Sequence, residues 1–367
     1  MKRLLLFLSV AIAVGCGGSG GGNSATPSAT VSTFISDSLD NNDHVWVTVH
    51  EIELLQGSGA VSVFDSTDGV QVDLKTLRDA TGARFRFMSQ HHVPEGTYTG
   101  ARVTLDKDLV IFTTGATTGT PMTFDSSLDA AAGKSALSLT FATPVTIASH
   151  GNDDIVIDFD LANWNEAGGI VTPVLKLGTH EGLDDQHRHE EGEYKGTVNG
   201  LTGTAPNQTF SLHSEESNDI TVAIDEKTQI VTNNGAGIAN GSRVEVEGAF
   251  DTTTNTLKAT SVRVEDQQGG GENEDEDAEG IISTVDANAG TFVMTISEAD
   301  GFLPANSTIT VDANGSSTEF FALQGDVVTK EAFFNLLAAG THVKAIGQLN
   351  TGTGVLEATK VLLKHDD

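Results

Sequence analysis

The sequence is short of cysteine, of basic residues and of aromatic residues, and each shortage excludes a class of protein. One of the 367 residues is a cysteine, so no disulfide can form within the chain and packed cores must stabilise it. Lys and Arg number 20 against 51 Asp and Glu, giving a formal net charge of -31, which argues against nucleic-acid binding. Aromatic residues make up 6%, so no platform of rings for stacking sugars stands out.

Long apolar runs are also missing. After Val14, no run approaches the roughly 20 residues that a membrane-spanning helix needs. The apolar run that is present, Leu4–Val14, follows the basic residues Lys2 and Arg3, which is the order of a secretory signal peptide. Small residues then lead to Cys16, the one cysteine of the chain.

This cysteine predicts an anchor. The segment resembles a bacterial lipoprotein signal, in which the thiol of Cys16 takes a diacylglycerol and cleavage leaves it as the first residue. Acyl chains gain about 0.8 kcal/mol per buried CH₂, so lipid on Cys16 is expected to hold the chain on a membrane. By the same resemblance, Gly17 in place of Asp favours the outer membrane, on its periplasmic or cell-surface face. The alternative is an ordinary signal peptide with an incidental cysteine.

Most of the remaining segments alternate apolar and polar residues with the period of a β-strand. Within Val45–Val49 the valines occupy odd-numbered positions, whereas Ile52 and Leu54 after them occupy even-numbered positions. A bulge is therefore expected near His50 and Glu51. Many short strands separated by turn residues favour a β-sandwich for the first domain.

Interruptions of this pattern predict a helix and two linkers. Val72–Thr81 is the stretch of the first domain that predicts a short helix. Residues 179–193, rich in histidine and acids, have no apolar periodicity and predict a linker. Residues 266–278 begin with polar residues and glycines and end in a run of mostly acidic residues. Because like charges repel and extend a segment, this composition predicts an acidic linker.

An internal repeat flanks the acidic linker. Asn240–Phe250 matches Ala339–Leu349, and Asn255–Glu265 matches Gly354–Lys364 at the same spacing. The second copy carries an insertion before these matches. Each copy is expected to be one small domain.

The insertion in the second copy predicts one helix. Thr329 is a suitable N-cap, Phe333, Leu336 and Leu337 would share an apolar face, and Gly340 would be the C-cap. One helix between the third and fourth strands of a five-stranded barrel is the arrangement of an OB-like fold. Each copy is therefore interpreted as an OB-like barrel.

The expected fold is thus all-β, with an N-terminal β-sandwich followed by two small OB-like β-barrels. Gly241 and Gly340, and likewise Gly248 and Gly347, occupy matching places and are expected to be turn or barrel-corner glycines. The expected segments are a signal peptide at 1–15, a flexible tether at 16–30, the sandwich at 31–178, a His/acid-rich linker at 179–193, repeat 1 at 194–265, an acidic linker at 266–278 and repeat 2 at 279–364.

Several motifs resemble known families. "FISDSLDNNDHVWVTVHEIELL", "VDLKTL", "VPEGTYTGARVTL" and "IVIDFDLANW" together resemble the bacterial lipoprotein family called domain of unknown function 4382. The two C-terminal copies, with G-x-x-V-x-V-x-G and L-x-A-T-x-V, resemble domain of unknown function 5666. The resemblance implies export and this architecture, and it supplies no catalytic residue.

A histidine cluster is the first candidate metal site. His180, His187 and His189 lie among acidic residues, and imidazole with carboxylate suits Zn²⁺, Cu²⁺ or Ni²⁺. The alternative interpretation is a solvated linker without a bound ion.

An Asp-rich loop is the second candidate metal site. Asp37, Asp40 and Asp43 lie close together in the sequence, and oxygen-rich loops suit Ca²⁺. Because Asp is also an ordinary turn residue, the alternative is a simple turn.

Known catalytic motifs are absent from the sequence. It contains no G-x-S-x-G elbow, H-E-x-x-H, P-loop or dinucleotide fingerprint. We therefore expect a non-enzymatic binding or structural module, held at the membrane by lipid on Cys16, with an envelope protein or a glycan as its partner. The alternative is a lipoprotein that binds Ca or Zn.

Overall fold

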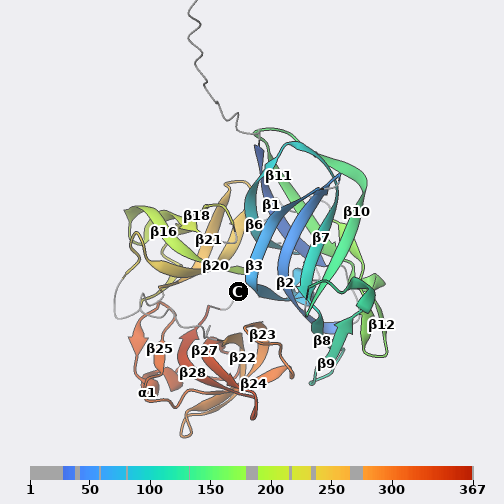
Figure 1. Ribbon diagram of the computed structural model, residues 1–367. Coiled ribbons are helices and arrows are strands. Elements are labelled where there is room, and N and C mark those ends of the chain that lie inside the picture. Colours follow the sequence, from blue (N-terminus) through green and yellow to red (C-terminus); the bar gives the residue numbers. More distant parts are fainter. Residues whose placement is uncertain are drawn as a thin grey trace, which may run out of the picture.

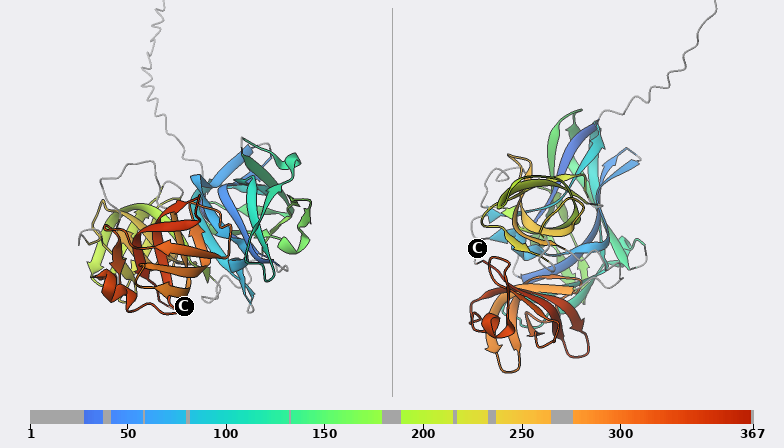
Figure 2. Two further views of the ribbon diagram at one scale, coloured as in Figure 1. Left: turned by 90° about the horizontal axis from the view of Figure 1, so that it is seen from below. Right: turned by 90° about the vertical axis from the view of Figure 1, so that its left-hand side faces the viewer.

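The computed structural model describes residues 28–37, 42–57, 59–79, 82–131, 133–178, 189–214, 217–232, 237–264 and 276–365. These residues are nearly all in β-strands, grouped into three domains that lie against one another (Figures 1 and 2). The expected all-β fold, a sandwich followed by two barrels, is confirmed. No helix in these ranges is long and apolar enough to cross a membrane.

The first domain is a sandwich whose two sheets enclose one apolar core. The five-stranded sheet has the order β14-β11-β1-β6-β15. Its strands are β1 (Ser28–Asp37), β6 (Phe85–Pro94), β11 (Asn152–Phe159), β14 (Leu175–Leu177) and β15 (His189–Glu190).

The eight-stranded sheet has the order β10-β7-β2-β8-β9-β13-β12, and β3 also pairs with β2. Its strands are β2 (Asn42–Gln56), β3 (Gly59–Asp73), β7 (Gly96–Asp106), β8 (Asp108–Thr113), β9 (Thr120–Phe124), β10 (Lys134–Ile147), β12 (Asn165–Ala167) and β13 (Ile170–Thr172). The remaining elements are the pair β4 (Arg78–Asp79) and β5 (Gly82–Ala83) and the short 3₁₀ turns η1 (Leu74–Leu77), η2 (Ser126–Leu128) and η3 (Leu161–Asn163).

Two local features of the sandwich follow the sequence. The register of β2 shifts between Val49 and Glu51 against both β3 and β7, which confirms the expected bulge. His50 is buried there, with Nε2 2.9 Å from Asp106. The helix expected at Val72–Thr81 is the single 3₁₀ turn η1, shorter than the prediction.

The second and third domains are barrels with the same strand order. Barrel 1 has the order β18-β17-β16-β20-β21 and is closed by β18 pairing with β21, while barrel 2 has the order β24-β23-β22-β27-β28 and is closed by β24 pairing with β28. Figure 2 (right) shows barrel 1 almost along its axis.

Barrel 1 consists of β16 (Gly192–Thr204), β17 (Asn207–His213), β18 (Ile220–Ile224), β19 (Gln229–Val231), β20 (Arg243–Asp251) and β21 (Thr256–Val264). Barrel 2 consists of β22 (Glu276–Asp286), β23 (Thr291–Asp300), β24 (Thr308–Asp312), β25 (Glu319–Phe321), β26 (Val327–Val328), the helix α1 (Lys330–Phe334), β27 (His342–Asn350) and β28 (Val355–Leu363).

The matching glycines have matching roles in the two barrels. The ladders between β20 and β21, and between β27 and β28, shift register at Gly248 and Gly347. A Cβ at either position would lie 2.1 Å from a carbonyl oxygen of the neighbouring strand, so only glycine permits this close approach. Gly241 and Gly340 have φ of +86° and +94°, which identifies both as turn glycines.

The helix of the insertion is shorter than predicted. Thr329 does cap α1, since its hydroxyl accepts a hydrogen bond from the Ala332 amide at 3.2 Å. The helix ends at Phe334, and Leu336 beyond it is 54% exposed instead of sharing a buried face with Phe333. Gly340 is therefore a turn residue and not the C-cap.

The predicted linkers also need correction, because strands begin inside them. Residues 189–190 form β15 and Gly192 begins β16, whereas the sequence predicts a linker over residues 179–193. β22 begins at Glu276 inside the predicted acidic linker, and its Asp277 is buried. Similarly, β1 begins at Ser28 inside the predicted tether.

Candidate functional site

The sandwich meets barrel 1 through stacked aromatic rings. Phe87 of β6 stacks on Phe250 of β20 with ring centroids 4.0 Å apart, and Phe34 of β1 lies edge-on to Phe87 at 5.5 Å. The hydroxyl of Tyr194 donates to the carbonyl oxygen of Phe87 at 2.8 Å, so its polar end is satisfied inside the contact. Rings from both domains therefore belong to one core.

The two barrels meet through buried charges. Lys344 of β27 is 3% exposed, and its Nζ lies within 3.5 Å of four carboxylates. The nearest is Glu247 at 2.7 Å, followed by Glu193 at 3.3 Å, while Glu245 and Asp277 both lie at 3.5 Å. Three of the four come from barrel 1, so the Lys344 side chain connects the barrels.

Further cations complete this ion network. Lys364 contacts Glu247, and its Nζ lies 3.4 Å from Glu279. Arg263 pairs with Glu245 through two of its nitrogens. His342 Nε2 lies 3.1 Å from Glu279.

Strand alternation explains why these charges gather. Within β20 the sequence Val-Glu-Val-Glu points its valines into barrel 1, leaving Glu245 and Glu247 on the outer face. Barrel 2 covers that face, and the exposures of the two residues fall to 2% and 8%. A pattern typical of a solvated face is thus buried between domains.

Crowding of acids changes their pKa values. Burial raises the pKa of Asp277 to about 7 and that of Glu193 well above its ordinary value. Neighbouring carboxylates such as Glu245 add to this effect on both groups. Burial acts in the same direction on Glu245, but Arg263 and Lys344 outweigh it and hold the pKa of Glu245 well below normal. Burial would lower the pKa of Lys344, yet the surrounding carboxylates raise it well above normal.

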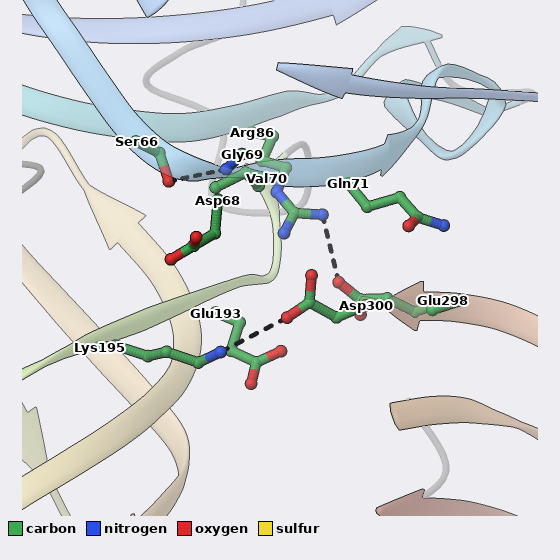
Figure 3. A pocket seen from close by; sticks show the side chains of 11 residues that line it. Ser66, Asp68, Gly69, Val70, Gln71, Arg86, Glu193, Lys195, Glu298 and Asp300 are labelled. Atoms are coloured by element: carbon green, nitrogen blue, oxygen red, sulfur yellow. Dashed lines mark hydrogen bonds and ion pairs between the residues drawn. The ribbon is translucent and has the colours of Figure 1, made fainter. Parts of the chain in front are cut away.

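A small cavity lies where all three domains meet (Figure 3). It is lined by Arg86 of the sandwich, Glu193 and Lys195 of barrel 1, and Glu298 and Asp300 of barrel 2. Arg86 binds Glu298 at 3.2 Å and Lys195 binds Asp300 at 3.4 Å. The volume of about 60 Å³ suits a few water molecules and is far below the 300–1,000 Å³ of small-molecule sites.

Three acids beside this cavity have the spacing of metal ligands. Ligand oxygens of Glu193, Asp277 and Asp300 lie within 4.8 Å of one another. Ammonium groups already contact all three, because Lys344 lies near Glu193 and Asp277 and Lys195 lies near Asp300. The group is therefore part of the ion network between the barrels.

A larger groove lies at the edge of barrel 2. Its volume is about 820 Å³, and its walls include Leu336, Ala339 and Leu363. Leu323, which also lines it, is 37% exposed. Lys364 and His365 lie at the same groove, so it combines apolar walls with a polar side.

The residues predicted to bind metal are only partly described. Asp37 is buried at the end of β1, and Asp43 accepts a hydrogen bond from the Gly115 amide at 2.6 Å. The backbone of His189 lies in β15, opposite Phe85. Cys16, His180, His187 and Asp40 lie outside the described residues, so neither predicted metal site is assembled or excluded by the structure.

Comparisons with known proteins match two of the three domains. Residues 28–172 match the family described as Domain of unknown function (DUF4382), and residues 195–263 match Domain of unknown function (DUF5666). No curated protein matches the chain. Among solved structures, Drosophila Unr CSD456 aligns at 14% identity with a TM-score of 0.18, over 48% of this chain and 63% of its own.

Proposed function

We propose that the chain is an exported, lipid-anchored protein of the outer membrane that acts as a non-enzymatic binding or structural module. The observation that carries the proposal is Cys16, the one cysteine, placed directly after a basic start and a short apolar run. The DUF4382 match begins at residue 28, a short distance beyond this cysteine.

The three domains suit a rigid module. Stacked rings join the sandwich to barrel 1, and buried ion pairs join barrel 1 to barrel 2. Such contacts hold surfaces of different domains in fixed positions, which benefits recognition because less entropy is lost on binding. The groove of barrel 2 offers apolar surface for an envelope protein or glycan partner.

We further propose that residues 279–364 are a second copy of the domain matched by residues 195–263. Both barrels have the same strand order, the same closure and a bulge glycine at the matching place. The insertion with α1 distinguishes the second copy.

Replacing the cysteine tests the anchor. The Cys16→Ser variant cannot form the thioether, so we expect it to lose palmitate labelling and to move from the detergent phase to the aqueous phase of Triton X-114. Ser24→Ala in the same segment is the control and should partition like the wild type. If Cys16→Ser still enters the detergent phase, lipid anchoring at this residue is wrong.

The alternative function is metal binding at His180, His187 and His189 or at Asp37, Asp40 and Asp43. Calorimetry with Zn²⁺ and Ca²⁺ would then show heat, and the melting temperature would rise at millimolar metal because the ion binds the folded state. Changing the three histidines to Ala should remove the Zn²⁺ signal alone. An absence of heat and of any thermal shift with both ions would remove this alternative.

A further inference from the structure

The faces that the two barrels present to each other carry more acidic than basic groups. The innermost carboxylates are Glu193, Glu245, Glu247, Asp277 and Glu279, and the side chains of all five are at most 13% exposed. The permanent cations among them are Lys344, Lys364 and Arg263, with His342 beside Glu279. With every acid ionised, the described part of this interface would bury two uncompensated negative charges.

Charged groups at the edge of the contact between the barrels do not remove this excess of negative charge. Arg86 from β6 pairs with Glu298 from β23, and Lys195 from β16 pairs with Asp300 from β23. Each of these two pairs carries one positive and one negative charge and is therefore neutral. Uncompensated charge in a place of low dielectric is costly, so the docked barrels are expected to take up protons.

We propose that the interface between the barrels is a proton-linked latch, in which docking of barrel 1 on barrel 2 requires extra protons on the buried acids and weakens as these leave. Among the described residues, Val231 of barrel 1 packs in one apolar cluster with Phe321, Ile346 and Leu362 of barrel 2. Gln229 of barrel 1 adds hydrogen bonds to the carbonyl oxygens of Ala322 and Leu363 of barrel 2. Neither kind of contact titrates, so the charge balance supplies the pH-dependent part of how firmly the barrels hold.

The pKa values of the individual acids determine whether docking strengthens or weakens as pH rises. The pKa values of Asp277 and Glu193 are raised in the docked state, so these groups hold protons that separated barrels would release. The contribution of Asp277 is present at low pH and is lost as pH rises from about 4 to about 7. The contribution of Glu193 is likewise lost as pH rises, because its pKa is also raised. His342 acts in the same direction, because its hydrogen bond to Glu279 raises its pKa.

Two other acids set the lower end of the pH range in which docking is tight. The pKa of Glu247 is lowered, because Lys344 and Lys364 outweigh the effect of burial, and the pKa of Glu245 is lowered as well. These groups stabilise docking above their ordinary pKa and lose that effect as pH falls further. Docking is therefore expected to be tightest near pH 5 and to loosen toward pH 8.

A cysteine at the interface measures this opening directly. In a Cys16→Ser chain, Val231→Cys places a thiol at a position that is 1% exposed and covered by barrel 2, so a thiol reagent reacts with it when the barrels separate. The reaction rate, divided by the rate of an unfolded reference peptide at each pH, gives the opening constant. EDTA is present throughout, so that no divalent cation takes part.

Each proton taken up on docking changes the opening constant by about tenfold per pH unit within its window. We therefore expect the constant to rise at least about tenfold between pH 5.5 and pH 8.5. Asp277→Asn carries no titrating group there, and its rise should be several-fold smaller. Asp286→Asn, at the exposed end of the same strand, should behave like the parent.

Two controls keep the test decisive. The variant Val63→Cys, in the same Cys16→Ser chain, places a thiol in the core of the sandwich. It reports opening of the first domain and should show no comparable rise in reaction rate. If Asp277→Asn fails to fold, Glu193→Gln replaces it with the same expectation. The latch is wrong if the opening constant at Val231→Cys is constant over this pH range. It is also wrong if the folded variant rises as steeply as its parent.

Discussion

Removing the ammonium group of Lys344 is expected to destabilise the chain by about 3–5 kcal/mol at pH 7, the range for breaking a buried ion pair. The Lys344→Met variant keeps an apolar stem of similar length and leaves four carboxylates without their shared cation. Urea unfolding followed by circular dichroism measures the loss. It should shrink toward pH 5, because the carboxylates can then take up protons.

A matched control separates this effect from the general loss of a lysine. Lys227→Met removes an exposed lysine of barrel 1 and should change the free energy of unfolding by less than about 0.5 kcal/mol. Combining Lys344→Met with Asp277→Asn and Glu193→Gln should recover part of the lost stability, since fewer charges remain unpaired. A Lys344→Met protein as stable as the wild type would show that the network contributes nothing to docking.

Truncating Phe87 is expected to cost about 3–5 kcal/mol, as for other buried aromatic residues changed to Ala. Its ring is 1% exposed and stacks on Phe250 across the contact between sandwich and barrel 1. Both tryptophans, Trp46 and Trp164, lie in the sandwich, and Trp46 also packs in one apolar cluster with barrel 2. Their fluorescence therefore reports the sandwich and its contact with barrel 2, while circular dichroism reports all three domains. In Phe87→Ala the two signals should no longer change at the same urea concentration.

The conservative change at the same position is the control. Phe87→Leu keeps most of the apolar volume and should cost less than about 1.5 kcal/mol. If Phe87→Ala also stays below that value and both signals still coincide, the ring pair is not what holds the sandwich against barrel 1.

Local patterns predicted the elements of this fold well. The change of parity after Val49 predicts the bulge in β2, and Thr329 predicts the start of α1. Gly248 and Gly347, expected as turn or barrel-corner glycines, lie at register shifts of their barrels. These features depend on neighbours in the sequence or on backbone conformation. They are therefore visible without knowledge of the tertiary structure.

The ion network was not predicted, because its signals also fit solvent exposure. Asp277 lies at the end of an acidic run, and Glu245 and Glu247 alternate with valines as on any solvated strand. Only the packing of one barrel on the other shows that these acids are buried. The available signal was Lys344, which stands in the repeat where the first copy has Glu245.

The difference between Glu245 in the first copy and Lys344 in the second has a consequence for self-association. In the contact between the barrels, Glu245 meets its own counterpart Lys344, and Glu193 lies beside its counterpart Asp277, as a twofold relation between the copies requires. Two molecules that met through barrel 1 alone would bring Glu245 against Glu245, and the like charges would repel. Charge reversal at one position thus disfavours a homodimer through two copies of this face and favours contact of barrel 1 with barrel 2.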